Sequence, residues 1–420
     1  MTVPAGYRLV DMPFSRRDEM LSVDEWAFAM THPEGTQTAV EAGIDWDRCR
    51  GIEAVDSRAS SASEVAAVHS SYGYSMRVPG GTVPTSGLTW VGVQPAHRRR
   101  GLLRAMIDDH FARSLARGEV VSTLVAAETK IYQRFGYGLA CPSYKMTMPR
   151  GATFREVAGS DDLRVRFEDA DVARHAPVVR AILARDPRPG AMVEMGEALM
   201  ASQFADPEAL REGQERKRIV IVEDEHGPAA FALFRRKLSW GDTGANGTGS
   251  TEQWAAVTPA ASRRLWSVLA DLDLLTSFSA TCLPLDDPAV LLADDVRALG
   301  LKAQDHVWLR ILDLPAALTA RTYGADLDVA VQVTDNVVPQ NDAVWHMTVE
   351  AGIARVTRAA DGAQADLRIS MQDLSAAYLG GTTIDSLKGA GLVEEATAGA
   401  ATTLSSAFRS PMAPRSSFSF

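Results

Sequence analysis

The sequence predicts an α/β protein built from more than one domain. Its 420 residues exceed what a single hydrophobic core usually organises, which favours two or three domains. Strand-like and helix-like segments alternate through the first two-thirds of the chain, and a later stretch repeats an earlier one. From about Lys302 the pattern changes to that of a smaller α+β unit.

The first part of the chain contains a strand–loop–helix–strand unit. Gly87–Val93 is rich in β-branched and aromatic residues, which is typical of a strand. Gly101–Arg117 carries its apolar residues on roughly one helical face, and Gly118 follows as a helix-ending glycine. Val120–Ala126 is a largely apolar run of the buried-strand type. The order of these segments predicts a βαβ-type unit with an arginine- and glycine-containing loop before its helix.

A second stretch of the chain resembles this unit. Trp90–Met106 reads WVGVQPAHRRRGLLRAM, and it aligns without a gap with Trp254–Ala270, which reads WAAVTPAASRRLWSVLA. Composition alone would rarely align a tryptophan, a Val-x-Pro-Ala and an arginine pair over so short a span. Gly101 is matched by Leu265, so the second copy lacks the residue that lets the backbone approach a ligand closely. We therefore predict a duplicated domain in which the first copy binds a ligand and the second is a scaffold.

Three domains are predicted, over residues 1–150, 151–301 and 302–420. Polar and glycine residues become frequent within Met148–Ser160, which marks the first boundary. Gly241–Thr251 has low complexity and no lysine or helix start after it, so it is interpreted as a solvated hairpin loop rather than a phosphate cradle. The elements expected in the third domain are helices at Leu314–Tyr323, Asp373–Leu379 and Gly391–Phe408, and strands at Leu327–Val333, Val344–Glu350 and Ala365–Ile369.

Composition excludes several classes of protein. The net charge of −10 argues against nucleic acid as a partner, because phosphate binding needs clustered cations. It suits a cationic substrate, although acidity for solubility alone is equally compatible with the charge. No run approaches the roughly 20 apolar residues of a membrane span, and the N-terminus lacks an apolar signal core. The three cysteines are far apart, and neither they nor the lone histidines have metal-ligand spacing. We expect a cytoplasmic protein without a metal site.

The loop Gln94–Leu103 carries the strongest chemical signal. Four arginines, Arg98, Arg99, Arg100 and Arg104, stand within seven residues at the start of a well-patterned helix. A strand that runs into a glycine-containing turn at a helix N-terminus offers unpaired amides and the positive end of the helix dipole. An arginine run can also be a solvated surface loop, but its place between a strand and a helix favours a site for a diphosphate, such as that of coenzyme A.

This segment resembles the Arg/Gln-x-x-Gly-x-Gly/Ala signature of the GNAT acetyltransferases, carried by Arg98, Gly101 and Leu103. Leu103 departs from the small residue of that signature. The longer run PAHRRRGLLRAM at Pro95–Met106 is similar to the PxHRRRGLLRAM of one family, the Eis (enhanced intracellular survival) acetyltransferases. Three further blocks resemble the same family, so that the resemblance covers the whole chain: IYQRFGYG at Ile131–Gly138, WLRILDLPAALTARTY at Trp308–Tyr323, and the C-terminal Ser-Phe-Ser-Phe.

The resemblance implies a fold, an assembly and a cofactor site. The fold is a catalytic GNAT domain, a degenerate GNAT-like domain and a sterol-carrier-protein-like domain, and the assembly is a homohexamer. The cosubstrate is acetyl-CoA, and backbone amides of the first-domain strand can polarise its thioester carbonyl. The family's acetyl-CoA contacts fall on Val91, Gly92, Val93, Arg99, Arg100, Gly101, Leu102, Leu103, Arg104, Ala127 and Glu128.

The resemblance also implies two catalytic groups. The general acid falls on Tyr132, whose phenol, with an unperturbed pKa near 10, would protonate the departing CoA thiolate. Without the resemblance, Tyr132 would be interpreted as a core aromatic, and Tyr137 is given that structural role. The general base falls on the terminal carboxylate of Phe420, which is an acceptor only and can take a proton from a substrate ammonium. Phe418 beside it indicates a docked tail rather than a frayed terminus.

The acceptor is predicted less directly. In the family, acidic and aromatic residues of a first-domain helix line the amine pocket, and this chain has Trp26, Phe28 and His32 there, after Asp24 and Glu25. None of these acids is assigned to the family's pocket position, so the resemblance implies acetyl transfer more directly than an aminoglycoside acceptor. We predict an N-acetyltransferase acting on primary amines of polycationic small molecules by direct transfer in a ternary complex. The alternatives are a protein-lysine acetyltransferase and a non-catalytic acyl-CoA or hydrophobic-ligand binding protein.

Overall fold

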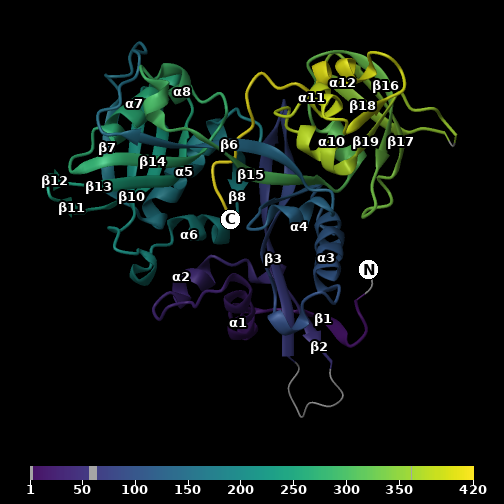
Figure 1. Ribbon diagram of the computed structural model, residues 1–420, viewed down its shortest axis with the longest axis horizontal. Helices are drawn as coiled ribbons and strands as arrows, with labels where there is room; N and C mark the ends of the chain where they lie inside the picture. Colours follow the sequence, from purple (N-terminus) through teal and green to yellow (C-terminus); the bar gives the residue numbers. More distant parts are fainter. Residues whose placement is uncertain (1–2, 56–63, 361) are drawn as a thin grey trace.

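The computed structural model describes residues 3–55, 64–360 and 362–420, and these form three lobes (Figure 1). The first domain, purple to blue, lies below, and the second domain, teal to green, lies at the upper left. The third domain, green to yellow, lies at the upper right. The C-terminal tail, the yellow segment that ends at the marker C, returns from the third domain to the junction of the other two.

The described residues of the first two domains share one 13-stranded sheet. Its two halves meet around β15, which pairs antiparallel with β5 on one side and with β6 on the other. The predicted third domain begins at residue 302 and so includes β15, whereas the backbone hydrogen bonds of β15 lie in this large sheet. In sheet order the strands are β1 (Tyr7–Asp11), β2 (Arg50–Ala54), β3 (Glu64–Val78), β4 (Gly81–Val93), β5 (Val121–Val125), β15 (Lys302–Ile311), β6 (Gly138–Pro149), β14 (Leu275–Leu283), β13 (Gly247–Ala256), β10 (Gly227–Lys237), β9 (Arg218–Asp224) and β7 (Arg164–Asp169), with β8 (Met192–Met195) on β3.

Helices cover this sheet in both domains. In the first domain α1 (Arg17–Phe28) and α3 (Leu102–Ala116) both pack on β3 and β4. In the second, α7 (Pro259–Ala270) packs on β9, β10 and β13. The remaining helices are α2 (Gln37–Ala42), α4 (Thr129–Gln133), α5 (Val172–Arg185), α6 (Glu197–Phe204) and α8 (Pro288–Leu292). The predicted hairpin loop at Gly241–Thr251 is wrong in its second half, because Gly247–Thr251 lies in β13. In front of it, β11 (Trp240–Gly241) and β12 (Gly244–Ala245) form a short antiparallel pair. No helix in the described ranges is long and apolar enough to cross a membrane.

The predicted repeat has the same order of elements in both copies, a strand followed by a helix. In the first copy β4 ends at Val93 and α3 begins only at Leu102, after the arginine loop. In the second copy β13 ends at Ala256 and α7 begins at Pro259, so only Val257 and Thr258 lie between them. The arginines that align in sequence therefore differ in place, because Arg99 precedes its helix and Arg263 lies within one.

The third domain is a separate five-stranded sheet with helices, as the α+β prediction requires. Its strand order is β18 (Ile353–Arg358), β17 (Ala343–Glu350), β16 (Leu327–Thr334), β19 (Leu367–Ser370) and β20 (Val393–Glu395). The predicted helix at Gly391–Phe408 is wrong in its first half, because Val393–Glu395 pairs with β19 and the helix begins at Ala400. The helices are α9 (Leu314–Thr319), α10 (Met371–Ala377), α11 (Ile384–Gly389) and α12 (Ala400–Phe408).

Candidate active site

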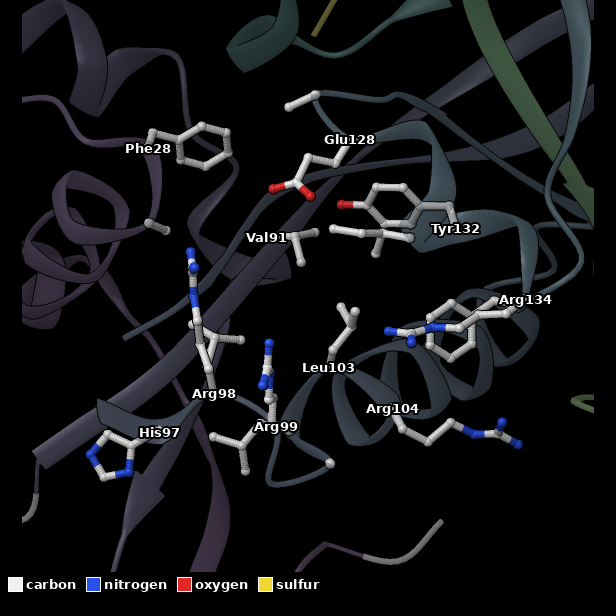
Figure 2. A pocket seen from close by; sticks show the side chains of 17 residues that line it. Phe28, Val91, His97, Arg98, Arg99, Leu103, Arg104, Glu128, Tyr132 and Arg134 are labelled. Atoms are coloured by element: carbon white, nitrogen blue, oxygen red, sulfur yellow. The ribbon is translucent and has the colours of Figure 1, made fainter. Parts of the chain in front are cut away.

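A cavity opens where β4 and β5 separate. The two strands pair in parallel from Thr85 to Gly87 of β4, and beyond Gly87 they diverge. The cavity beside this opening has a volume of about 690 Å³ (Figure 2). Its lining comes from β4, the arginine loop, α1, α3 and α4: Ala27, Phe28, Val91, Val93, His97, Arg98, Arg99, Gly101, Leu102, Leu103, Arg104, Ala127, Glu128, Ile131, Tyr132, Arg134 and Phe135.

The floor of the cavity is the open N-terminus of α3. Gly101 is the N-cap residue with φ of 82°, a left-handed conformation that glycine adopts without strain, and no side chain caps the helix. The first amides of α3 are therefore available to an external acceptor, and the helix dipole adds positive potential there. Arg98 and Arg99 point from the loop into the same space, whereas Arg104 points away from its centre (Figure 2). This arrangement suits an anionic group with several oxygens, as in a diphosphate.

A bulge in β4 shapes the wall of the cavity. Between the pairs Val68–Gly92 and Ser70–Thr89, β4 has one residue more than β3, and Trp90 has φ of 54°. A bulge of this kind bends the strand and re-aims its groups, often beside a functional site. Because β4 is unpaired with β5 beyond Gly87, its backbone groups on that edge are free to contact a ligand. The sequence gives no signal for this bulge, since neither glycine nor proline occupies it.

The hydroxyl of Tyr132 and the carboxylate of Glu128 point into the same part of the cavity (Figure 2). Tyr132 lies in α4 and packs edge-on against Tyr137, with 6.0 Å between the ring centroids. Burial, followed by the nearby Glu128 carboxylate, raises the pKa of Tyr132 to about 12. The phenol therefore keeps its proton at neutral pH. Tyr137 is fully buried, and its hydroxyl shares a 2.7 Å hydrogen bond with Ser122, as the structural role given to it requires.

The C-terminal tail reaches the first domain at the point where β4 and β5 part. The ring of Phe420 lies edge-on to Tyr72 and Tyr74, with 6.0 Å between the centroids in each pair. It occupies the space left by the missing side chain of Gly87, because a Cβ atom there would lie 2.7 Å from Cε2 of Phe420. The tail is thus docked, although Phe420 does not line the cavity of Figure 2.

Asp24 of α1 and His32 of the turn that follows it form a buried pair of ionisable side chains. Nε2 of His32 lies 3.3 Å from Oδ2 of Asp24, and its ring faces Trp90 at 6.3 Å between centroids. Burial raises the pKa of Asp24 to about 6, partly offset by His32. Glu25 accepts a hydrogen bond from the His32 amide, and Trp26 is 63% exposed. The buried carboxylate of Asp24 on the α1 side of the cavity is therefore paired with His32.

Most of the predicted cofactor residues line the cavity, but Gly92 and Arg100 do not, and Leu102 does so only as a buried residue of its wall. Gly92 faces α1, where a Cβ atom would lie 3.1 Å from Cβ of Ala27, so its smallness serves packing. Arg100 donates a 3.1 Å hydrogen bond to the hydroxyl of Tyr7 instead of lining the cavity. Leu102 begins α3 and is almost fully buried, although it touches the cavity wall. The lining residues missing from the predicted set are Ala27, Phe28, His97, Arg98, Ile131, Arg134 and Phe135.

Three regions of the chain match models of known families. Residues 13–140 match "Acetyltransferase (GNAT) domain", and residues 196–311 match a second model of that description. Residues 314–416 match "Sterol carrier protein domain". The two matched GNAT regions include the two copies of the repeat.

Relatives and a solved structure are similar to most of this chain. The chain is 37% identical over 347 residues to an uncharacterized N-acetyltransferase of Streptomyces coelicolor, which covers 82% of this chain and 83% of that protein. It is 30% identical to the N-acetyltransferase Eis of Mycobacterium tuberculosis, over 82% of this chain and 83% of that protein. The crystal structure of Eis1 from Mycobacterium abscessus superposes with a TM-score of 0.80 at 27% identity, over 99% of this chain and 100% of that one.

Proposed function

The chain belongs to the Eis family of GNAT N-acetyltransferases, and we propose that it transfers an acetyl group from acetyl-CoA directly to a primary amine of a polycationic small molecule. The observation that carries the proposal is the cavity at the uncapped N-terminus of α3, which places an anion-binding floor below a tyrosine hydroxyl. Acetyl-CoA, when bound, supplies the activated carbonyl group. Direct transfer needs a bound amine, a proton acceptor and a proton donor, but no covalent enzyme intermediate.

The floor of the cavity would hold the diphosphate of acetyl-CoA. The α3 amides would donate hydrogen bonds to the phosphate oxygens, and Arg98 and Arg99 would add charge-assisted hydrogen bonds. Above them, the free edge of β4 from Val91 to Val93 would hold the pantetheine arm and donate a backbone hydrogen bond to the thioester oxygen.

Tyr132 would act as the general acid. Its hydroxyl points into the cavity, and a pKa of about 12 keeps it protonated through the working pH range. It would deliver the proton to the departing sulfur of CoA. Among the residues that line the cavity, Tyr132 carries a hydroxyl proton directed into the space, which makes it the candidate for this step.

The terminal carboxylate of Phe420 would act as the general base. The ring is seated between Tyr72, Tyr74 and Gly87, which holds the chain end at the opening between β4 and β5. A carboxylate held there can accept a proton from the substrate ammonium, directly or through water. By family resemblance we also propose a homohexamer, which light scattering on the purified protein would test.

Thiol release from acetyl-CoA tests the function. The purified chain is mixed with acetyl-CoA and a panel of amines: aminoglycosides, polyamines and a lysine peptide. Release with several aminoglycosides or polyamines supports the proposal, and release with the peptide alone supports the protein-lysine alternative. Tight acetyl-CoA binding without release from any amine would contradict a polycationic acceptor and favour a binding protein.

Tyr132→Phe tests the acid separately. Loss of the hydroxyl should lower kcat by about 10²-fold while the KM for acetyl-CoA stays within twofold, because the ring still fills its place. Tyr137→Phe is the matched control, since the Tyr137 hydroxyl is buried against Ser122 and outside the cavity. Wild-type kcat in Tyr132→Phe would remove this residue from the mechanism.

A further inference from the structure

The tail has strong anchors before its last two residues. The Arg415 guanidinium lies 4.0 Å from the centroid of the Trp254 ring and 3.5 Å from the carboxylate of Asp186. Phe418 is fully buried and packs on Phe231, with 6.4 Å between the ring centroids. These contacts hold the tail against the second domain. Contacts made by the residues after Phe418 therefore determine where the chain end points, because the tail is already anchored before them.

Two buried side chains hold the penultimate residue, Ser419. Nε2 of Gln203, in α6, donates a 3.2 Å hydrogen bond to the carbonyl oxygen of Ser419. Nε2 of His306, in β15, shares a 3.0 Å hydrogen bond with the Ser419 hydroxyl. Gln203 and His306 are only 4% and 5% exposed. Because the peptide unit is planar, fixing the Ser419 carbonyl sets the direction in which Phe420 leaves the chain.

Two strand irregularities bring this contact about. In the first bulge, the two β15 residues Asp305 and His306 lie opposite the single residue Pro142 of β6. In the second bulge, the two β14 residues Thr281 and Cys282 lie opposite the single residue Lys145 of β6. Cys282 has φ of 63°, and its Sγ lies 3.4 Å from Nε2 of His306. One extra residue in each strand beside β6 re-aims a side chain toward the tail, as bulges next to active sites do. Without the extra residue in β15, His306 would stand in the regular alternation of that strand.

The histidine is suited to holding Ser419 without attracting the neighbouring carboxylate. Burial, followed by the charge of Arg415, lowers the pKa of His306 to about 4. The imidazole is therefore neutral at neutral pH. A charged imidazole would attract the terminal carboxylate, one residue further along the chain, into an ion pair. The carboxylate would then be less available to take a proton from the substrate ammonium. A neutral one orients the Ser419 hydroxyl and leaves the carboxylate free to accept a proton.

We infer that His306 and Gln203 are positioning residues that aim the terminal carboxylate of Phe420 through their hydrogen bonds to Ser419. This inference rests on the proposed function, in which that carboxylate is the general base. It predicts that removing the contact at Ser419 lowers turnover without weakening acetyl-CoA binding.

The experiment compares variants of the full chain with an amine that supports thiol release. Ser419→Ala removes the hydroxyl and keeps the terminal carboxylate. His306→Leu removes the ring nitrogen, and His306→Gln restores an amide near the position of Nε2. Ser417→Ala is the matched control, because the buried Ser417 hydroxyl has no hydrogen-bond partner within the described chain. A chain that lacks Phe420 tests the terminal base itself. Each variant is assayed for kcat, for the KM of acetyl-CoA and for the rate at which carboxypeptidase releases the terminal residue.

We expect Ser419→Ala and His306→Leu to lose about tenfold or more in kcat, since misplacing a catalytic group by about 1 Å costs up to 10²-fold. The KM for acetyl-CoA should stay within twofold, His306→Gln should recover most of the turnover, and Ser417→Ala should match the wild type. Carboxypeptidase should release the terminal residue faster from Ser419→Ala than from Ser417→Ala.

The outcomes separate the inference from the proposed function. Wild-type kcat in Ser419→Ala, with turnover abolished by deletion of Phe420, would overturn the positioning role and leave the terminal base standing. Full turnover after deletion of Phe420 would overturn the terminal base, and the positioning role with it. Should His306→Leu fail to fold, Ser419→Ala still decides the question, because it leaves the buried histidine in place.

Discussion

Gly87 provides a sharp test of the seat of the tail, because its missing side chain is the space that the Phe420 ring occupies. In Gly87→Ala the new Cβ would lie 2.7 Å from Cε2 and 2.8 Å from Cζ of that ring. Ordinary contact begins at 3.4 Å, so the ring must move by at least about 0.7 Å. The backbone does not oppose the change, since alanine costs less conformational entropy than glycine in a strand.

The expected result of Gly87→Ala is a loss in turnover. A displacement near 1 Å of a catalytic group costs up to 10²-fold, so kcat should fall by about 10- to 100-fold. The KM for acetyl-CoA should change little, because Gly87 does not line the cavity. The assay is thiol release at saturating acetyl-CoA with the best amine of the panel. Gly389→Ala is the control, since a Cβ at Gly389 meets nothing within 4 Å.

A compensating variant makes the test specific. Combining Gly87→Ala with Phe420→Leu makes room for the new methyl group while keeping a terminal carboxylate. This double variant should recover part of the lost kcat. Wild-type kcat in Gly87→Ala would refute the reasoning that the seat of the ring matters for catalysis. A parallel loss of acetyl-CoA affinity would show instead that the change disturbs the cavity.

Three further predictions follow from other parts of the molecule. Arg99→Ala should raise the KM for acetyl-CoA by about tenfold or more, the cost of a charge-assisted hydrogen bond, while Arg150→Ala, which removes an exposed arginine of the same charge, should not. Burial raises the pKa of Asp24 to about 6, so its contribution to the free energy of unfolding should fall by about 3 kcal/mol as the pH rises from 4 through 6. Urea unfolding of the wild type should show this fall, and that of Asp24→Asn, which cannot ionise, should lack it. Asp335→Ala should lower the free energy of unfolding by about 3–5 kcal/mol in the same assay, because it leaves the guanidinium of Arg310, which is 0% exposed, without its 2.5 Å partner.

Local signals predicted the parts of the site that are contiguous in the chain. The arginines, Gly101 and the helix face after them lie within one short segment, and the structure brings them together at the start of α3. Tyr132 was predicted from the resemblance of Ile131–Gly138 to the family's segment, and its hydroxyl points into the same cavity. Such features depend on helix start signals and turn glycines, which a single sequence carries.

Features that depend on distant pairing could not be read in this way. The bulge at Trp90 exists only relative to β3, and nothing in the composition of β4 indicates an extra residue there. The place of β15 between β5 and β6 joins segments separated by more than 150 residues, so no local signal could assign it to this sheet. The same holds for His306, which had no partner in sequence and acquires one only when the tail returns to Ser419.

The two copies of the repeat differ in how their helices begin. In the second copy the Thr258 side chain accepts a 3.1 Å hydrogen bond from the Ala261 amide, so α7 is capped from within. Its aligned arginine, Arg263, donates to the backbone of Arg155 and to the hydroxyl of Ser160 instead of facing a cavity. In the first copy no side chain caps α3, and Arg98 and Arg99 point into the cavity. A helix start that satisfies its own amides has little affinity left for an anion, whereas one that does not must find an external acceptor. Under the proposed function, the loop before α3 and its glycine, rather than the arginines alone, therefore distinguish the first copy from the second.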